Sequence, residues 1–200
     1  MHPRRLSTLI LGFWLGASLL MTWVATDNFG SVERALKPAT KSAEEAIAGI
    51  GPETTRTLLR YHASEQNRRY FLYWGLAQIV LGIALALVLL FATNGNTVTM
   101  ILAAGMLAST GVQRFFIAPQ MIEIGRALDF ASIDEYREER RAFWNYHRAY
   151  TIVELAKLGC GAALALRLLL SSGGSGRRRR SRLDAEIDFV NDPNHSHVDR

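Results

Sequence analysis

The sequence predicts an all-α integral membrane protein, with a four-helix bundle, short extramembrane helices and a disordered C-terminal tail. Apolar residues make up 49% of the 200-residue chain, and most of them are collected in four blocks. Each block runs for roughly 20 residues, which as an α-helix crosses the roughly 30 Å hydrocarbon core of a bilayer. The predicted spans cover residues 6–26, 70–92, 98–118 and 150–170.

A soluble protein with four buried core helices is the alternative for these blocks. A soluble helix needs a polar face, and residues 79–91 contain no polar side chain. A chain this short also has too little polar surface to cover four such helices. The first block resembles a signal peptide, but it is too long, and Trp23 stands where cleavage after Ala25 needs a small residue. We therefore expect an uncleaved first span in a membrane domain of residues 1–170.

The formal net charge of +5 does not indicate nucleic-acid binding. Much of it comes from arginines at 177–180 and 182, which follow the last apolar block. Such a cluster is typical of a cytoplasmic flank and of contact with anionic headgroups. Residues 171–176 (SSGGSG) read as a linker, so residues 171–200 are predicted to be a flexible tail.

Two long polar stretches, residues 27–69 and 119–148, separate the spans. The turn at 94–96 (NGN) predicts that the second and third spans form a hairpin, which places both stretches on the side opposite that turn. A helix is expected from Ser42 to a break at 49–52, a second from Pro52 into the second span, and another over 133–146. Lysine and arginine counts favour cytoplasmic termini, although the long stretches are also basic.

Charged and amide side chains inside the apolar blocks are the candidate functional residues, because a charge in lipid is costly unless it is paired or hydrated. Arg114 and Glu154 are expected at equal depth below the surface that faces the polar stretches, which predicts an ion pair. Lys157 lies one turn deeper and competes for the carboxylate. Together with Gln78 and His147 these residues form the predicted polar intramembrane site.

Two interpretations of that site remain open at this point. The polar residues are either a contact that fixes the helices relative to one another or a pocket for a small solute or ion. A channel through the whole membrane is disfavoured, because the other half of the bilayer has no comparable group of polar side chains to line it. Gly12 and Gly16 in the first span lie four residues apart, a spacing that supports close helix packing or a homodimer.

A third hypothesis is a redox module in which His62 and His147 bind haem b axially. An absorption band of the purified protein that is lost on His147→Ala would support it. No metal site is expected, since His195 and His197 lie in the predicted tail and Cys160 is the only cysteine.

Three short motifs resemble a known family. They are residues 12–17 (GFWLGA), residues 115–121 (FFIAPQM) and residues 143–150 (FWNYHRAY). The chain resembles the bacterial membrane-protein family catalogued as domain of unknown function 4149, which is similar to transmembrane protein 205. Pro119, which closes the third span in that family, and His147 match its pattern, whereas Tyr146 replaces a leucine and the first polar stretch is longer.

The resemblance implies a multi-pass protein of the bacterial inner membrane with no established activity. The expected function is therefore non-enzymatic: handling of a small solute or ion, or support of a larger membrane assembly as an accessory subunit or homodimer. No signature of a soluble enzyme is present in the sequence.

Overall fold

The structure, a computed structural model, describes residues 3–37, 40–92, 96–131 and 136–190. These residues form helices and, within those ranges, no strand. The elements in chain order are α1 (Pro3–Ala35), α2 (Lys41–Ile50), α3 (Pro52–Ala92), α4 (Thr97–Val112), the π-helical segment η1 (Gln113–Ile117), α5 (Ala118–Leu128) and α6 (Arg137–Val190).

Three helical stretches are long and apolar enough to cross a membrane: Pro3–Ala35, Pro52–Phe91 and Thr97–Leu128. Their outward faces carry large apolar side chains, among them Phe13, Val80 and Ile101, each of which is more than 60% exposed. Apolar surface this extensive needs an apolar surrounding. The all-helical prediction is confirmed, and these stretches fit a multi-pass membrane protein.

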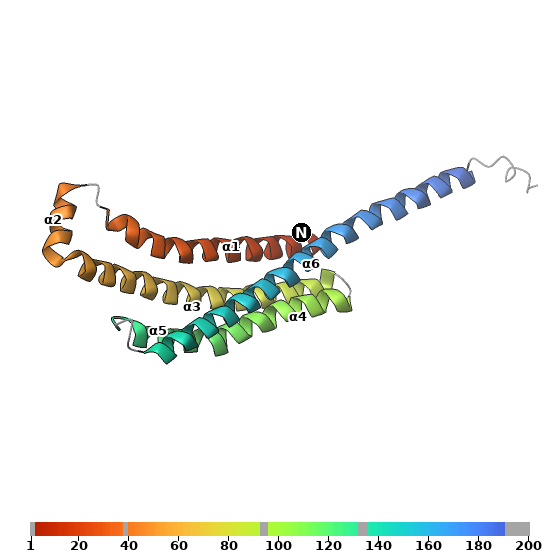
Figure 1. Cartoon of the computed structure of the whole chain (residues 1–200). Helices are drawn as coiled ribbons and strands as arrows, with labels where there is room; N and C mark the ends of the chain where they lie inside the picture. The colour runs from red at the N-terminus through yellow and green to blue at the C-terminus, as the bar shows by residue number, and fades with distance from the viewer. Residues whose placement is uncertain (1–2, 38–39, 93–95, 132–135, 191–200) are drawn as a thin grey trace, which may run out of the picture.

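The two ends of the molecule differ in what they carry (Figure 1). The chain starts at the end of the molecule where α3 is followed by α4. Helix α6 continues past this same end toward its C-terminus. At the other end lie α2, α5 and the start of α6. Both polar stretches thus lie at one end and the α3–α4 connection at the other, as the sequence predicts.

The first polar stretch folds as expected. Helix α2 ends at Ile50, and Gly51 has a φ of 98°, a left-handed conformation that glycine adopts readily. Helix α3 then begins at Pro52, where a missing N–H costs nothing, and continues as one helix into the second apolar block. At the edge of the first two predicted spans, Asn67 of α3 donates to the Ala25 carbonyl oxygen of α1 at 2.9 Å and accepts from Asn28 at 2.6 Å.

Pro119 does not end the third apolar helix. The chain passes from α4 through η1 into α5 and stays helical to Leu128. A proline inside an α-helix removes a hydrogen bond and clashes with the carbonyl four residues earlier. The π-helical segment before it widens the turn, with the Ala118 N–H bonded to the Gln113 carbonyl oxygen five residues back. The helix therefore continues past residue 118, the predicted end of the third span, because the wider turn makes room for the ring.

Helix α6 begins at Arg137 within the expected helix, whose residues 133–135 lie outside the described ranges. It runs without a break from the second polar stretch through the fourth apolar block to Val190. The predicted flexible tail over 171–200 is therefore not confirmed. Residues 191–200, with His195 and His197, lie outside the part that the structure describes.

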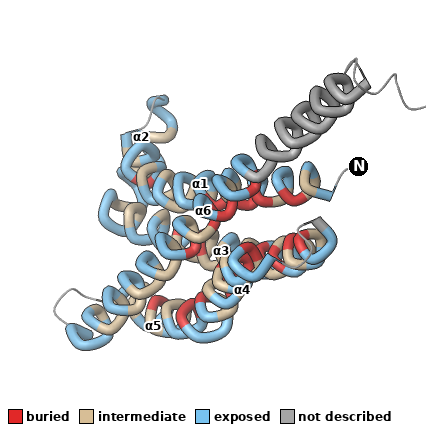
Figure 2. The backbone as a smooth tube through the Cα atoms, turned by 90° about the vertical axis from the view of Figure 1, so that its right-hand side faces the viewer, coloured by how far each residue is buried: buried red, intermediate tan, exposed pale blue. Residues whose placement is uncertain are grey.

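A buried apolar cluster joins α1, α3, α4 and α6, and the buried residues run along the sides of the helices that face each other (Figure 2). Side chains of the third and fourth apolar blocks thus pack on those of the first two. Gly12 and Gly16 have no neighbouring atom within 4 Å of an added Cβ, so they do not take part in this packing. The members of this apolar cluster are Leu11, Trp14, Leu85, Leu89, Ala103, Met106, Leu164 and Leu168.

Candidate functional site

A lysine is buried where the four helices meet. Lys157 on α6 is 1% exposed, and its ammonium group has three N–H donors. They reach Glu154 Oε2 at 2.7 Å, Gln113 Oε1 at 3.3 Å and Gln78 Oε1. The buried cation therefore has one acceptor from α6, one from η1 and one from α3, which uses its full hydrogen-bonding capacity.

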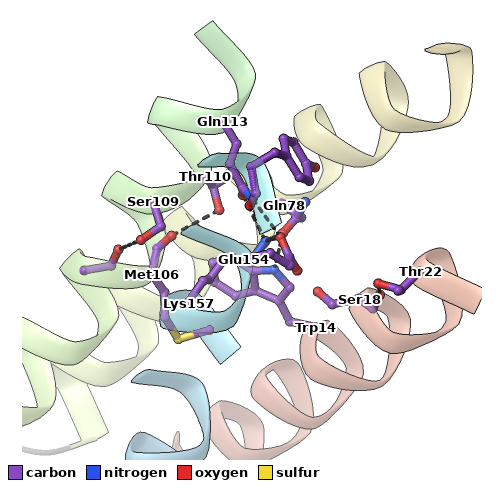
Figure 3. Close-up of polar contacts among 12 residues, drawn as sticks. Trp14, Ser18, Thr22, Gln78, Met106, Ser109, Thr110, Gln113, Glu154 and Lys157 are labelled. Carbon is purple, nitrogen blue, oxygen red and sulfur yellow. Dashed lines mark hydrogen bonds and ion pairs between the residues drawn. The ribbon is translucent and has the colours of Figure 1, made fainter. Parts of the chain in front are cut away.

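The acceptors of Lys157 are themselves held by further contacts (Figure 3). Trp14 Nε1 of α1 donates to Gln78 Oε1 at 3.0 Å. Gln113 Nε2 donates to Glu154 Oε2 at 2.9 Å and to the Tyr150 carbonyl oxygen at 3.2 Å. We call Trp14, Gln78, Gln113, Glu154 and Lys157 the Lys157 cluster. Its members come from α1, α3, η1 and α6, so one hydrogen-bonded network connects segments up to 143 residues apart, from residue 14 to residue 157.

The ion pair in this cluster is not the one predicted between Arg114 and Glu154. Glu154 pairs with Lys157, one helical turn further along the same helix. Among the described residues, its carboxylate also accepts from Gln113, which takes the place expected for Arg114. Gln113 continues the buried face of α4 that contains Met106 and Thr110 and so reaches α6, whereas Arg114, the next residue, packs against Gly75 of α3. The sequence indicated the depth of these groups but not which of two adjacent residues faces the carboxylate.

Arg114 lies on η1, and its side chain packs against α3, apart from the Lys157 cluster. An added Cβ at Gly75 would lie 2.8 Å from Arg114 Cδ, so the arginine stem fits only because residue 75 is a glycine. Arg114 Nε is buried and has no hydrogen-bond partner in the described part of the chain. The guanidinium carbon lies 5.6 Å from the centre of the Phe115 ring. This charge is thus less fully compensated than that of Lys157.

A small pocket lies between Arg114 and the Lys157 cluster, with room for about one water molecule. Gln78 and Gln113 belong both to its wall and to the Lys157 cluster. The pocket is a place where the cluster meets open space rather than packed side chains. Its lining residues are Phe71, Gly75, Gln78, Thr110, Gln113, Arg114, Ala118 and Tyr150.

The histidines lie elsewhere. His147 on α6 is exposed, stacked on Phe143 with ring centres 6.3 Å apart and edge-on to Trp144 at 5.5 Å. Among the described residues, no hydrogen bond or ring contact joins His147 to the Lys157 cluster, so the predicted polar site is only partly assembled. His62 on α3 is exposed as well. The haem hypothesis stays a prediction. In the described ranges no three His, Cys, Asp or Glu residues are grouped to hold a metal ion.

A second polar cluster, which sequence reasoning missed, lies outside the apolar blocks. Arg68 of α3 forms two hydrogen bonds with the Asp129 carboxylate at the end of α5, at 2.7 and 3.0 Å, and one with Glu65 at 2.7 Å. Arg126 Nε lies 3.4 Å from the same Glu65 oxygen. The Arg68 hydrogen bond, opposed by burial and aided by Arg126, lowers the pKa of Glu65. We call Glu65, Arg68, Arg126 and Asp129 the Arg68 cluster, and it connects α5 to α3. The sequence gave no signal for it, because 61 positions separate Arg68 from Asp129.

Comparisons with models of protein families, with curated proteins and with solved structures gave no match. The resemblance to the domain of unknown function 4149 family, and the haem and partner hypotheses, therefore remain predictions. What this protein does has to be argued from the geometry of its own residues.

Proposed function

We propose that the chain is a four-span protein of a bacterial inner membrane, with α6 supplying the fourth span over residues 150–170. Two observations support a fourth span. Leu164 and Leu168 of α6 are buried in the apolar cluster with side chains from the three apolar helices. The charges of Glu154 and Lys157 also neutralise each other within the bundle, which lowers the cost of placing them in lipid.

Accessibility of single cysteines tests this topology. In a Cys160→Ser background, Ser42→Cys reports on the first polar stretch and Ser196→Cys on the C-terminal end. With cytoplasmic termini, a membrane-impermeant maleimide added to intact spheroplasts labels position 42 and not position 196. Labelling of both positions from outside would mean that α6 does not cross the membrane.

We further propose that the bundle binds one small ion or polar solute at the pocket beside the Lys157 cluster, entering from the side of the polar stretches. The observation that supports this is a fully buried lysine whose amide partners also form the wall of an open pocket. Apart from the Trp14 indole N–H, which already donates to Gln78, the apolar cluster below it offers no polar group to a solute. The site accordingly takes up a ligand from one side and does not conduct it through the membrane.

Native mass spectrometry of the gently extracted full chain, with a thermal-unfolding screen of ions and small polar solutes, tests this proposal. The wild type should carry or be stabilised by one ligand. The double variant Glu154→Gln/Lys157→Met, which removes both charges together, should lose it while staying folded. A wild type that binds nothing in either assay would leave the Lys157 cluster as a contact between helices, as in an accessory subunit of a larger assembly.

A further inference from the structure

The charges inside the polar half of the bundle do not cancel. Lys157 and Glu154 form a pair with a 2.7 Å contact, so together they are neutral. Arg114 adds a further positive charge, and arginine stays protonated in proteins. Its buried Nε has no acceptor among the described residues. A buried donor of this kind is costly unless an acceptor is supplied, which indicates that something outside the chain supplies it.

Nearby carboxylates are already engaged. Glu154 accepts from Lys157 and Gln113. Glu65 and Asp129, the acidic groups of the Arg68 cluster, are hydrogen-bonded to Arg68. Among the described residues, no hydrogen bond or ion pair joins Arg114 to these carboxylates.

The groups around Arg114 indicate what kind of acceptor its guanidinium group binds. The pocket presents amide and hydroxyl groups of Gln78, Gln113 and Thr110 beside the guanidinium group. Its enclosed part holds about one water molecule, so a ligand enters with one or two small oxygen atoms and keeps its remainder outside. Guanidinium groups bind planar or tetrahedral oxyanions through parallel hydrogen bonds.

The depth of Arg114 agrees with a ligand at the membrane surface. It lies five residues before Pro119, about 7 Å along a helix axis. With the third span ending at residue 118, as the sequence predicts, the headgroup layer begins at about that distance, and an arginine stem spans it easily. Phe115 and Phe116, which follow Arg114, are 60% and 70% exposed and so face the lipid tails.

We infer that Arg114 and the pocket beside it bind a phosphate oxyanion, either the headgroup of an anionic phospholipid or free phosphate. This assignment rests on the proposed ligand-binding function and names its chemical class. Gly75 is a positioning residue in this account, because only a residue without a side chain lets the Arg114 stem pass.

The test uses full-length protein stripped of lipid in dodecyl maltoside. Phosphatidylglycerol is titrated against diacylglycerol with the same acyl chains, and sodium phosphate against sodium chloride at equal ionic strength. We expect saturable one-to-one binding in at least one of the two phosphate arms, seen as a retained adduct in native mass spectrometry and a rise in thermal midpoint. Binding of the lipid alone assigns a headgroup, and binding of inorganic phosphate assigns a soluble anion.

Arg114→Gln should weaken this binding roughly tenfold to hundredfold, the range for losing a charged hydrogen-bonding group. Arg148→Gln is the matched control, since Arg148 is exposed on the same side of the molecule and this variant should bind like the wild type.

If Arg114→Gln does not fold, hydrogen exchange of the wild type decides instead, with ligand-dependent protection expected over residues 71–78 and 110–118. Equal binding by Arg114→Gln, protection outside those segments, or no binding in either arm overturns the inference. Binding of a different ligand from the solute screen, without competition by phosphate, would overturn it while leaving the proposed function standing.

Discussion

The two halves of the helical core are held together in different ways. Toward the α3–α4 connection, apolar side chains such as Leu85 and Leu164 pack with essentially no exposure. Toward the polar stretches, the same helices meet through the Lys157 cluster, in which the lysine donates to three different acceptor side chains. Lipid tails are as apolar as leucine, so close contacts such as that of Gly161 with Leu15, rather than the burial of apolar surface, hold the first half together. The polar half fixes the register, because a one-residue shift would leave a buried charge without its acceptors.

The largest effect is expected where a single change leaves the buried cation unpaired. Glu154→Gln removes the only carboxylate bonded to Lys157 in the described structure. We expect a loss of about 3 kcal/mol or more in the free energy of unfolding, measured by titration with dodecyl sulfate in mixed micelles. Glu123→Gln is the control, because Glu123 is exposed on α5 and its removal should change stability little. Equal effects of the two variants would contradict the comparison.

A smaller effect is expected in the apolar half. Leu85→Ala removes a side chain that is 0% exposed and leaves a cavity, which costs about 2 kcal/mol in the free energy of unfolding. Leu87→Ala, two residues on, truncates a side chain that is 53% exposed and should be nearly neutral. The same detergent titration measures both. A larger loss for Leu87 than for Leu85 would mean that α3 is rotated relative to this packing.

Trp14→Phe should have a smaller effect still. It keeps most of the apolar volume and removes one hydrogen bond to Gln78. Gln78 Oε1 still accepts a hydrogen bond from Lys157. A loss of about 1 kcal/mol is expected from buried hydrogen bonds of this kind in membranes. Trp23→Phe, at a 63% exposed position on the same helix, is the matched control. If the two variants were equally stable, the Trp14 hydrogen bond would contribute nothing to holding α1.

The smallest effect concerns the Arg68 cluster and pH. The Arg68 hydrogen bond holds the pKa of Glu65 below its ordinary value of 4.5, so the folded state binds a proton less readily than the unfolded state. Its contribution to stability is therefore complete above the ordinary pKa and is lost as pH falls through the lower folded value. We expect about 1 kcal/mol or less. Unfolding titrations at pH 7 and at successively lower pH should show this loss in the wild type and a weaker one in Glu65→Gln. Identical pH profiles would show that Glu65 is not responsible.

Sequence patterns were sufficient for much of the fold. The apolar blocks, the break at residues 49–52 and the placement of both polar stretches at one end all follow from local composition and chain geometry. The passage through Pro119 did not, because a π-helical turn depends on packing around the helix and has no sequence rule of its own. Gln113, and not Arg114, reaches Glu154 because it continues the buried face of α4 that contains Met106 and Thr110, so the predicted ion pair was wrong.

The candidate site was predictable in depth but not in detail. Gln78 and Glu154 were expected at similar depth with Lys157 one turn deeper, and Lys157 does contact both of them. Trp14 was not expected among them, although a buried indole N–H needs an acceptor and a buried glutamine offers one. The Arg68–Asp129 contact also escaped notice, because residues 61 positions apart in polar stretches carry no periodic signal.

The claim on which the rest depends is that Lys157, and not Arg114, is the partner of Glu154. Double-mutant cycles on the free energy of unfolding test it most directly. Glu154→Gln should be largely rescued by Lys157→Met, with a coupling of about 2 kcal/mol, since removing both charges leaves none unpaired. Glu154→Gln and Arg114→Gln should be additive within about 0.5 kcal/mol. Rescue by Arg114→Gln together with additive losses for Glu154→Gln and Lys157→Met would contradict the account.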